Sequence, residues 1–575
     1  MDFLYQHNMN TNTILSRQYI PQSLVIKTWQ DIEPFYQQLK SAELASFTQL
    51  QNWLAQRSEL ETMLQEEMGW RYIRMTCDTQ NKNYETDFNY FVTDIEPHCA
   101  SFTNDLNQMF LACPYHGDLD SRYANFIRTV KSQVAIFRPE NIPLKATLQQ
   151  KEQQYGAIAA AMTVDVDGKT LTLQQAAVYL KDNDRTKREL VYKTIANRRL
   201  ADADTLQKLF TELVNLRQQI AANAGFTNYR DYAFEAMCRF DYTANDCFNF
   251  HNSIAKCVMP LCNVLDANRK SQLKVESYKP WDTEVDAQGL STLKPFSNGE
   301  QMLDKSIACF DDIDPMLGNC LRQLKTLQRV DLDSRIGKAP GGYNYPLYET
   351  NVPFIFMNAS GLLRDLVTMV HEGGHAIHSV VSSDLPYVEM KSFPSEVAEL
   401  ASMSMELISM EHWHVFFDNK DDLKRARREH LEDVLTVLPW IAAVDKFQHL
   451  IYTNENNENV RLKLWNETFN AFSSSVINWQ DCERFKTFIW QKQLHIFEVP
   501  FYYIEYGMAQ LGAIAMWRNY KLQPAETIQQ YVAALQLGYT KSISQIYEAA
   551  GVRFDFSESY INELMKFVQD ELNAL

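Results

Sequence analysis

The segment HEGGHAIHS, His371 to Ser379, combines residue types that can bind a metal ion and move a proton. His371 and His375 are four residues apart, so on a helix both imidazoles lie about 6 Å apart along one face and can reach a single ion. Glu372 stands beside the first histidine, where its carboxylate can hold a water molecule. This His-Glu-x-x-His spacing is that of two zinc ligands and a general base. The sequence therefore predicts one zinc ion per chain.

A helix is needed to hold these residues, and the surrounding sequence predicts one. Apolar residues recur at three- and four-residue spacing over residues 362–381. Gly373 and Gly374 interrupt this pattern, and glycine inside a helix costs about 1 kcal/mol relative to alanine. We therefore expect something to approach the backbone closely at this point. A substrate lying over the metal would supply the reason.

A catalytic zinc needs a third protein ligand and an open position, and SFPSEVAELASMSMELI supplies the candidates. Glu399 and Glu406 are seven residues apart and fall on one face of an otherwise apolar predicted helix. Buried carboxylates need cationic or metal partners, because isolated buried charges are costly. We predict Glu399 as the ligand and Glu406 as the residue that orients a ligand histidine. Spacing alone leaves Glu396 open, and both carboxylates could instead meet arginines elsewhere.

Two further residues near the motif need an interpretation. His378 lies seven residues beyond His371, about 10.5 Å along a helix, which is too far to share an ion with it. We predict that His378 is a core residue or supports the site from outside. Asp365 either orders His371 or pairs with Arg364 or a distant base.

Composition limits the class of protein. The chain has 575 residues, is 46% hydrophobic and carries a net charge of −17. It lacks a basic cluster, which argues against nucleic acid as a partner. The ten cysteines form no CxxC pair, and neither a signal peptide nor an apolar run of roughly 18 residues is visible. We expect a cytoplasmic protein without a membrane partner, and the oligomeric state stays open.

The pattern along the chain is mainly helical with a little β structure. VDVDGKTLTL, Val164 to Leu173, predicts a β-hairpin with Asp167-Gly168 at its turn, and VPFIFMN predicts a short strand that ends at Asn358. We divide the chain into an N-terminal helical region, residues 1–190, and a region with the metal motif, residues 191–575.

Several segments together resemble the oligoendopeptidase F and thimet-oligopeptidase-like family of zinc metallopeptidases. They are HEGGHAIHS with PSEVAELASMSME, GKAPGGYNY, PFIFMNASG and HIFEVPFYYIEYG, in consistent order from the Asp167 hairpin to near the C-terminus. The resemblance implies an elongated multi-helix protein with a deep central channel, zinc at its floor and short peptides as substrates. It also implies that Glu399 is the third ligand.

The C-terminal motif resembles the family's groups that stabilise the oxyanion formed during peptide hydrolysis. These are His495 and a tyrosine, for which we rank Tyr506 first, then Tyr503, then Tyr502. The chain has 28 tyrosines, and clustered aromatic residues usually pack, so packing alone is the alternative.

Two other matching segments are expected beside the substrate. VPFIFMNAS could present an edge strand whose backbone pairs with an extended peptide, or it could be an ordinary buried strand. GKAPGGY, Gly337 to Tyr343, would be a mobile loop by resemblance, or else a plain flexible connection.

The predicted reaction is hydrolysis of internal bonds in short unstructured peptides. Glu372 would accept a proton from the attacking water and deliver it to the leaving amine, and zinc would activate that water. A carboxydipeptidase on the same scaffold is the first alternative, and an inactive peptide-binding protein is the second. Glu372 argues against the inactive protein, because binding alone has no use for a general base.

Overall fold

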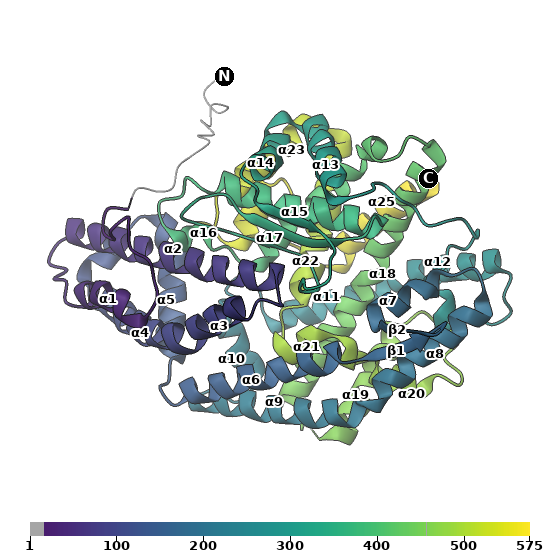
Figure 1. Cartoon of the computed structure of the whole chain (residues 1–575), viewed down its shortest axis with the longest axis horizontal. Helices are drawn as coiled ribbons and strands as arrows, with labels where there is room; N and C mark the ends of the chain where they lie inside the picture. Colours follow the sequence, from purple (N-terminus) through teal and green to yellow (C-terminus); the bar gives the residue numbers. More distant parts are fainter. Residues whose placement is uncertain (1–16, 456) are drawn as a thin grey trace. The chain divides into compact units, whose positions relative to one another are not determined.

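Figure 1 shows the computed structural model of the chain, which describes residues 17–455 and 457–575. Most of these residues are helical, and the strands form two small sheets. The mainly-α class predicted from the sequence is confirmed. The start of the chain, on which the prediction of no signal peptide depends, lies outside the described residues.

The chain forms two compact units, each assembled from three segments. The first unit comprises Met1–Val134 (described from residue 17), Leu293–Ala426 and Gly512–Phe554, and the second comprises Ala135–Thr292, Arg427–Leu511 and Asp555–Leu575. Packing partners within a unit therefore come from distant parts of the sequence. The predicted division at residue 190 stays a prediction.

The first unit holds the predicted metal motif between helices and a three-stranded sheet. Its α-helices are α1 (Glu33–Lys40), α2 (Phe47–Cys77), α3 (Lys82–Tyr90), α4 (Glu96–Ala112), α13 (Gly299–Ile313), α14 (Pro315–Thr326), α15 (Leu363–Val381), α16 (Val388–Lys391), α17 (Ser395–Met410), α23 (Pro524–Leu535) and α24 (Ile543–Ala549). Helices α5 (Ala124–Ile136), α18 (Lys420–Thr453) and α22 (Ile504–Leu522) each include a boundary between the units.

The sheet of the first unit has the order β3-β5-β4, so β5 (Phe354–Ala359) is its central strand. Strand β3 (Val330–Asp333) pairs with β5 in parallel, and β4 (Tyr343–Tyr345) pairs with its other side in antiparallel. The prediction that VPFIFMNAS presents an edge strand is therefore wrong, because both of its edges already have partners. The buried-strand alternative is correct, and β4 forms an edge of this sheet.

The glycine-rich loop at residues 337–342 is tied to the sheet at its base. The buried Lys338 ammonium donates to the Asp331 carboxylate at 2.9 Å, and burial lowers the pKa of this lysine. The Asn358 side-chain amide donates to the Gly341 carbonyl at 2.9 Å. These contacts fix the position at which the loop leads into β4. A plain flexible connection would not need such contacts.

The second unit contains the predicted hairpin and a large aromatic core. Strands β1 (Thr163–Val166) and β2 (Lys169–Thr172) pair in antiparallel, with Asp167 and Gly168 both at positive φ in the turn, so the hairpin prediction is confirmed. The α-helices of this unit are α6 (Asn141–Ala160), α7 (Leu173–Ala177), α8 (Arg185–Ala201), α9 (Ala203–Asn223), α10 (Tyr229–Ala236), α11 (Ala244–Cys257), α12 (Met259–Leu273), α19 (Glu458–Ala471), α20 (Glu483–Phe488), α21 (Leu494–Glu498) and α25 (Glu558–Ala574).

Helix α18 is the longest helix of the described residues. It has 34 residues, and among the described helices it alone is long and apolar enough to cross a membrane. However, 72% of its most apolar window is buried inside the structure, as in the core helix of a soluble protein.

Candidate metal centre and associated groups

Asp365 caps the helix that carries the predicted histidines. Its Oδ2 accepts hydrogen bonds from the backbone N–H groups of Ser360 and Leu362 at 2.7 and 3.0 Å, just before α15 begins. A carboxylate at this end also interacts favourably with the helix dipole. The prediction that Asp365 orders His371 is therefore wrong.

His371, His375 and Glu399 form one group of possible ligand atoms. The two histidines are one turn apart on α15, and Glu399 faces them from α17. Oε2 of Glu399 lies 3.4 Å from Nε2 of His371 and 3.7 Å from Nε2 of His375. The two histidine side chains are each 19% exposed, whereas that of Glu399 is 7% exposed, so the group is shielded but still reachable.

Glu406 holds the first histidine through its other nitrogen. Two turns beyond Glu399 on α17, its Oε1 lies 2.6 Å from Nδ1 of His371, which is the kind of contact predicted for it. A hydrogen bond at Nδ1 leaves Nε2 to face Glu399 and an ion. Burial alone would lower the pKa of His371, but the bond to Glu406 and the charge of Glu399 raise it to about 10.

The two glycines of the motif permit close packing within the protein. A Cβ on Gly374 would lie 2.6 Å from Cα of Ser402, so the backbones of α15 and α17 touch here. A Cβ on Gly373 would lie 2.9 Å from the ring of Phe310 on α13. The close approach was predicted, but the partners are another helix and a phenylalanine ring, not a substrate.

Glu372 has the environment of a residue that exchanges protons near neutral pH. It is buried on α15, and burial together with the charge of Glu399 raises its pKa to about 7, against the opposing effect of His371. Asn344 of β4 donates from its side-chain amide to the Glu372 carbonyl at 3.4 Å, which links the sheet to the motif. Burial, and then the charge of His371, hold the pKa of His375 well below its usual value.

The composition of the group fits a divalent metal ion. Two imidazoles lie among three carboxylates, those of Glu372, Glu399 and Glu406, so negative charge is in excess in a shielded place. A cation would balance this charge, and two imidazoles with one carboxylate are a known zinc-binding set. The residues present therefore fit a metal of this kind.

Two alternative residues do not join this group. Glu396 is buried in the first turn of α17, where its backbone carbonyl accepts a hydrogen bond from Tyr547 at 2.9 Å. His378 is fully buried and stacks on Phe393 with ring centroids 3.4 Å apart. Burial lowers the pKa of His378 to about 3, which keeps it neutral. Its position is that of a core residue, as predicted.

The histidine and tyrosines of the C-terminal motif form a cluster in the second unit. The ring centroid of His495 lies 4.8 Å from that of Tyr503, 5.9 Å from Tyr506 and 6.0 Å from Tyr502. Nδ1 of His495 lies 2.7 Å from the side-chain amide of Gln493, and burial lowers its pKa to about 4. The rings are therefore together, while their role in a reaction stays a prediction.

A strained turn positions these tyrosines, and no local sequence pattern predicts it. Phe501 has a φ of 71°, a left-handed conformation that is costly for a bulky residue. Its N–H donates to Gln448 at 2.9 Å, and its carbonyl accepts from Arg239. Arg239 also forms a buried ion pair with Glu505 at 2.6 Å. These contacts offset the strain, and no local motif marks Arg239 as their source.

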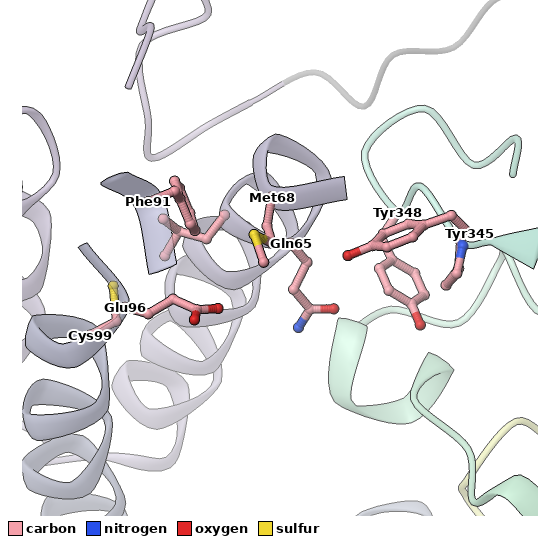
Figure 2. A pocket seen from close by; sticks show the side chains of 9 residues that line it. Gln65, Met68, Phe91, Glu96, Cys99, Tyr345 and Tyr348 are labelled. Atoms are coloured by element: carbon pink, nitrogen blue, oxygen red, sulfur yellow. The ribbon is translucent and has the colours of Figure 1, made fainter. Parts of the chain in front are cut away.

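A pocket of about 420 Å³ lies in the first unit beside the end of β4. Figure 2 shows the Glu96 carboxylate and the Gln65 amide pointing into it, opposite Tyr345 and Tyr348. The other lining residues are Leu64, Met68, Phe91, Cys99 and Pro346. The walls are thus mostly apolar, with a single carboxylate among the lining residues.

Comparison with known proteins identifies the family. The family model described as peptidase family M3 matches residues 178–566, and that of the peptidase M3 N-terminal domain matches residues 24–137. This chain belongs to peptidase family M3. Because M3 peptidases are metallopeptidases, membership implies a metal ion, in agreement with the donor group on α15 and α17.

Characterised relatives of the family are distant in sequence. The chromosomal oligoendopeptidase F of Lactococcus lactis subsp. cremoris is 24% identical over 322 residues, which cover 55% of this chain and 52% of that protein. Oligopeptidase PepF of Bacillus subtilis is 24% identical over 254 residues, covering 43% of this chain and 37% of that protein. The chain thus spans about half the length of the first of these relatives and less of the second.

Solved structures share the fold over almost the whole chain. A structure of PZ peptidase A with an inhibitor superposes with a TM-score of 0.87 at 23% identity, covering 95% of this chain and 96% of that one. Oligoendopeptidase F from Enterococcus faecium gives a TM-score of 0.64 at 14% identity, covering 95% and 97%. The predicted helical peptidase fold is confirmed.

Proposed function

We propose that this protein is a zinc-dependent oligoendopeptidase that hydrolyses internal bonds of short, unstructured peptides. The observation that carries the proposal is the group on α15 and α17, in which His371, His375 and Glu399 converge with Glu372 beside them. Family membership and the oligopeptidase relatives support the same activity.

Zinc is the proposed ion, held by His371, His375 and Glu399. Two imidazoles and one carboxylate leave room for water or substrate in a catalytic zinc site, whereas magnesium and calcium prefer oxygen donors. When bound, zinc would supply a Lewis acid that polarises the scissile carbonyl and activates water. Glu406 would keep His371 in the tautomer whose Nε2 faces the ion.

Glu372 is the proposed general base and acid. A carboxyl group whose pKa is about 7 can accept a proton from water and return it to the leaving amine, with a small free-energy cost for either transfer. The hydrogen bond from Asn344 to the Glu372 carbonyl holds this part of α15 against β4.

Tyr506, with His495 or Tyr503, is proposed to donate hydrogen bonds to the oxyanion. A phenol and a half-buried imidazole can both act as donors, and their ring contacts keep them in place. Such preorganised donors typically contribute several kcal/mol to stabilising the transition state. Arg239 and the turn at Phe501 would set the position of the tyrosines.

Substrate binding is proposed to use the edge strand β4. An extended peptide can add to a sheet edge through backbone hydrogen bonds, and such pairing accepts many sequences. The pocket beside Tyr345 could then take a peptide side chain. The net charge of −17 would disfavour strongly acidic peptides. The predicted deep channel, which would exclude folded proteins, is part of the same proposal.

A cytoplasmic location also belongs to the proposal. All ten cysteines lie in the described residues, and none of them forms a disulfide, as is usual for proteins of the reducing cytosol.

An internally quenched peptide blocked at both ends tests the activity. We expect zinc-dependent cleavage at an internal bond and no cleavage when the same segment is placed in a structured loop of a folded protein. Cleavage that requires a free C-terminus and releases dipeptides would favour the carboxydipeptidase alternative. Peptide binding without any cleavage, in protein that contains zinc, would favour an inactive carrier.

A further inference from the structure

The second unit contains another cluster of possible ligand side chains, separate from the group of His371, His375 and Glu399, which we call the M3 group. Cys247 and His251 are one turn apart on α11, and Asp445 and His449 are one turn apart on α18. All four residues are at most 1% exposed. Two helices therefore each present a pair of polar side chains to the same interior point.

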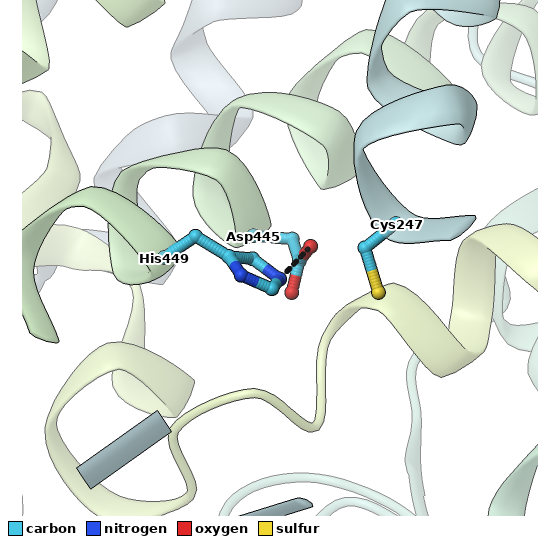
Figure 3. A group of neighbouring side chains, drawn as sticks. All are labelled: Cys247, Asp445 and His449. Carbon is cyan, nitrogen blue, oxygen red and sulfur yellow. Dashed lines mark ion pairs between the residues drawn. The ribbon is translucent and has the colours of Figure 1, made fainter. Parts of the chain in front are cut away.

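The four groups lie within reach of one ion or of one another. Nε2 of His251 lies 2.7 Å from Oδ2 of Asp445, and Nε2 of His449 lies 3.3 Å from the same oxygen. One ligand atom each from Cys247, Asp445 and His449 lies within 4.8 Å of the other two. Figure 3 shows the Asp445 carboxylate between the His449 ring and the Cys247 side chain.

Several polar atoms of this cluster have unmet hydrogen-bonding capacity. Nδ1 of His449, Oδ1 of Asp445 and Nδ1 of His251 are buried without a hydrogen-bond partner. Aromatic rings surround His449, with centroids of Phe248 and Phe501 at 4.9 and 5.3 Å. A buried polar atom without a partner is costly, so several of them in one place indicate a bound group.

We propose that Cys247, Asp445 and His449 bind a second zinc ion, as a structural site between α11 and α18. Thiolate, imidazole and carboxylate together suit zinc, whereas magnesium and calcium rarely accept sulfur. His251 would hydrogen-bond to Asp445 and hold it in place, as groups around metal ligands commonly do.

Burial makes this site structural. Its side chains are almost fully enclosed, so a peptide has no access to the ion. The histidines of the M3 group, by contrast, are partly exposed. The ion would join two helices of the second unit that belong to different segments of the chain. The site is independent of the proposed peptidase activity.

Metal analysis of the full-length protein, purified without chelators after growth with added zinc, tests the proposal. We expect two equivalents of zinc in the parent protein and one in His375→Ala, which disables the M3 group. Cys247→Ser should also retain one equivalent. The matched control is Cys262→Ala, which removes another buried thiol of the second unit and should retain both.

Cobalt substitution identifies the ligand directly. The M3 group contains no sulfur donor, so only the second site can give a thiolate-to-cobalt charge-transfer band. This band should be present in the parent protein and in His375→Ala, and absent in Cys247→Ser. Because the parent protein alone gives the primary result, failure of a variant to fold does not leave the proposal untested.

The possible results distinguish failure of the second zinc site from failure of the proposed peptidase function. One zinc equivalent in the parent, lost in His375→Ala and accompanied by no thiolate band, would overturn the second site and leave a metal-free hydrogen-bonded cluster. A thiolate band that disappears in Cys262→Ala but persists in Cys247→Ser would also overturn it. A protein that shows the band but cleaves no peptide would contradict the proposed function and support this site.

Discussion

Two helix pairs, one in each unit, gather titratable side chains by the same device but in different surroundings. In each pair, one helix (α15 or α11) carries two polar side chains one turn apart. The facing helix (α17 or α18, respectively) supplies a carboxylate. Around His371 the group is partly exposed and includes Glu372, whose pKa is raised to about 7 by burial. Around His449 all four side chains of the cluster are buried. Access and an adjacent base, not the ligand spacing itself, therefore distinguish a site for chemistry from a site for stability.

The largest effect is expected at Glu372, the proposed base, which has no counterpart in the cluster around His449. Glu372→Gln should lower kcat about 10²–10⁴-fold, because the amide fills the same space but cannot accept a proton. Zinc content should remain at the parental level. Glu399→Ala should instead lose both activity and the zinc of this group.

Plasma mass spectrometry with a quenched-peptide assay makes both measurements. Zinc lost from Glu372→Gln but retained in Glu399→Ala would reverse the two assignments.

The next effect concerns Tyr506. Tyr506→Phe should lower kcat about 10²–10³-fold with little change in KM, because the phenol is proposed to meet charge that develops mainly in the transition state. Tyr502→Phe, in the same ring cluster, is the control and should have a much smaller effect. Parental kcat in Tyr506→Phe would assign the role to Tyr503 or Tyr502, or reduce the cluster to packing.

A smaller effect is expected at the carboxylate that supports His371. Glu406→Gln should weaken zinc binding or activity about 10–100-fold, because it removes the charge from the hydrogen bond at Nδ1. Glu411→Gln, just beyond the end of α17, should leave both at parental values. Competition with a zinc-binding dye measures the affinity. Equal affinities for the two variants would mean that Glu406 contributes only to packing.

The contact between the ligand-bearing helices predicts a change in stability. Gly374→Ala should destabilise the protein by roughly 1–3 kcal/mol, because the new Cβ would meet the backbone of Ser402 at 2.6 Å. Gly156→Ala on α6 is the matched control, since its Cβ would meet nothing nearer than 3.8 Å. That change should stabilise by about 0.5–1 kcal/mol. Thermal unfolding of both variants measures the two changes in stability. An unchanged Tm for Gly374→Ala would show that the helices can separate freely.

The smallest effect concerns the pocket beside β4. Glu96→Gln should raise KM for peptides that carry a lysine or arginine by at most about fivefold, because the carboxylate is exposed and screened by solvent. Peptides with a neutral side chain at the same position should be unaffected. A KM increase of the same size for both peptides would remove this pocket from substrate recognition.

Local sequence patterns were sufficient for features that a single element determines. The spacing of His371 and His375 predicted a helix with both rings on one face, and Asp167-Gly168 predicted the hairpin turn. The partial burial of Glu406 and its contact with His371 followed from carboxylates on an apolar helix.

Features that depend on distant segments were not accessible from the sequence. The edge or central position of β5 is decided by β3 and β4, which pair with it from elsewhere in the chain. His251 and Asp445 are 194 residues apart, and no spacing rule says that their helices face each other. The partner of Gly374, on α17, was hidden for the same reason.

The contact at Gly374 also has a consequence for how the protein responds to heat. With no side chain between them, α15 and α17 have little freedom to move apart while their ligands stay in place. Tyr531 adds a hydrogen bond to the carbonyl of Ala401 at the same point of α17, at 2.9 Å. We therefore expect metal release and separation of the two helices to be one cooperative event. In Cys247→Ser, which should retain only the zinc held by His371, His375 and Glu399, a zinc-sensitive dye should then report the unfolding temperature of the first unit.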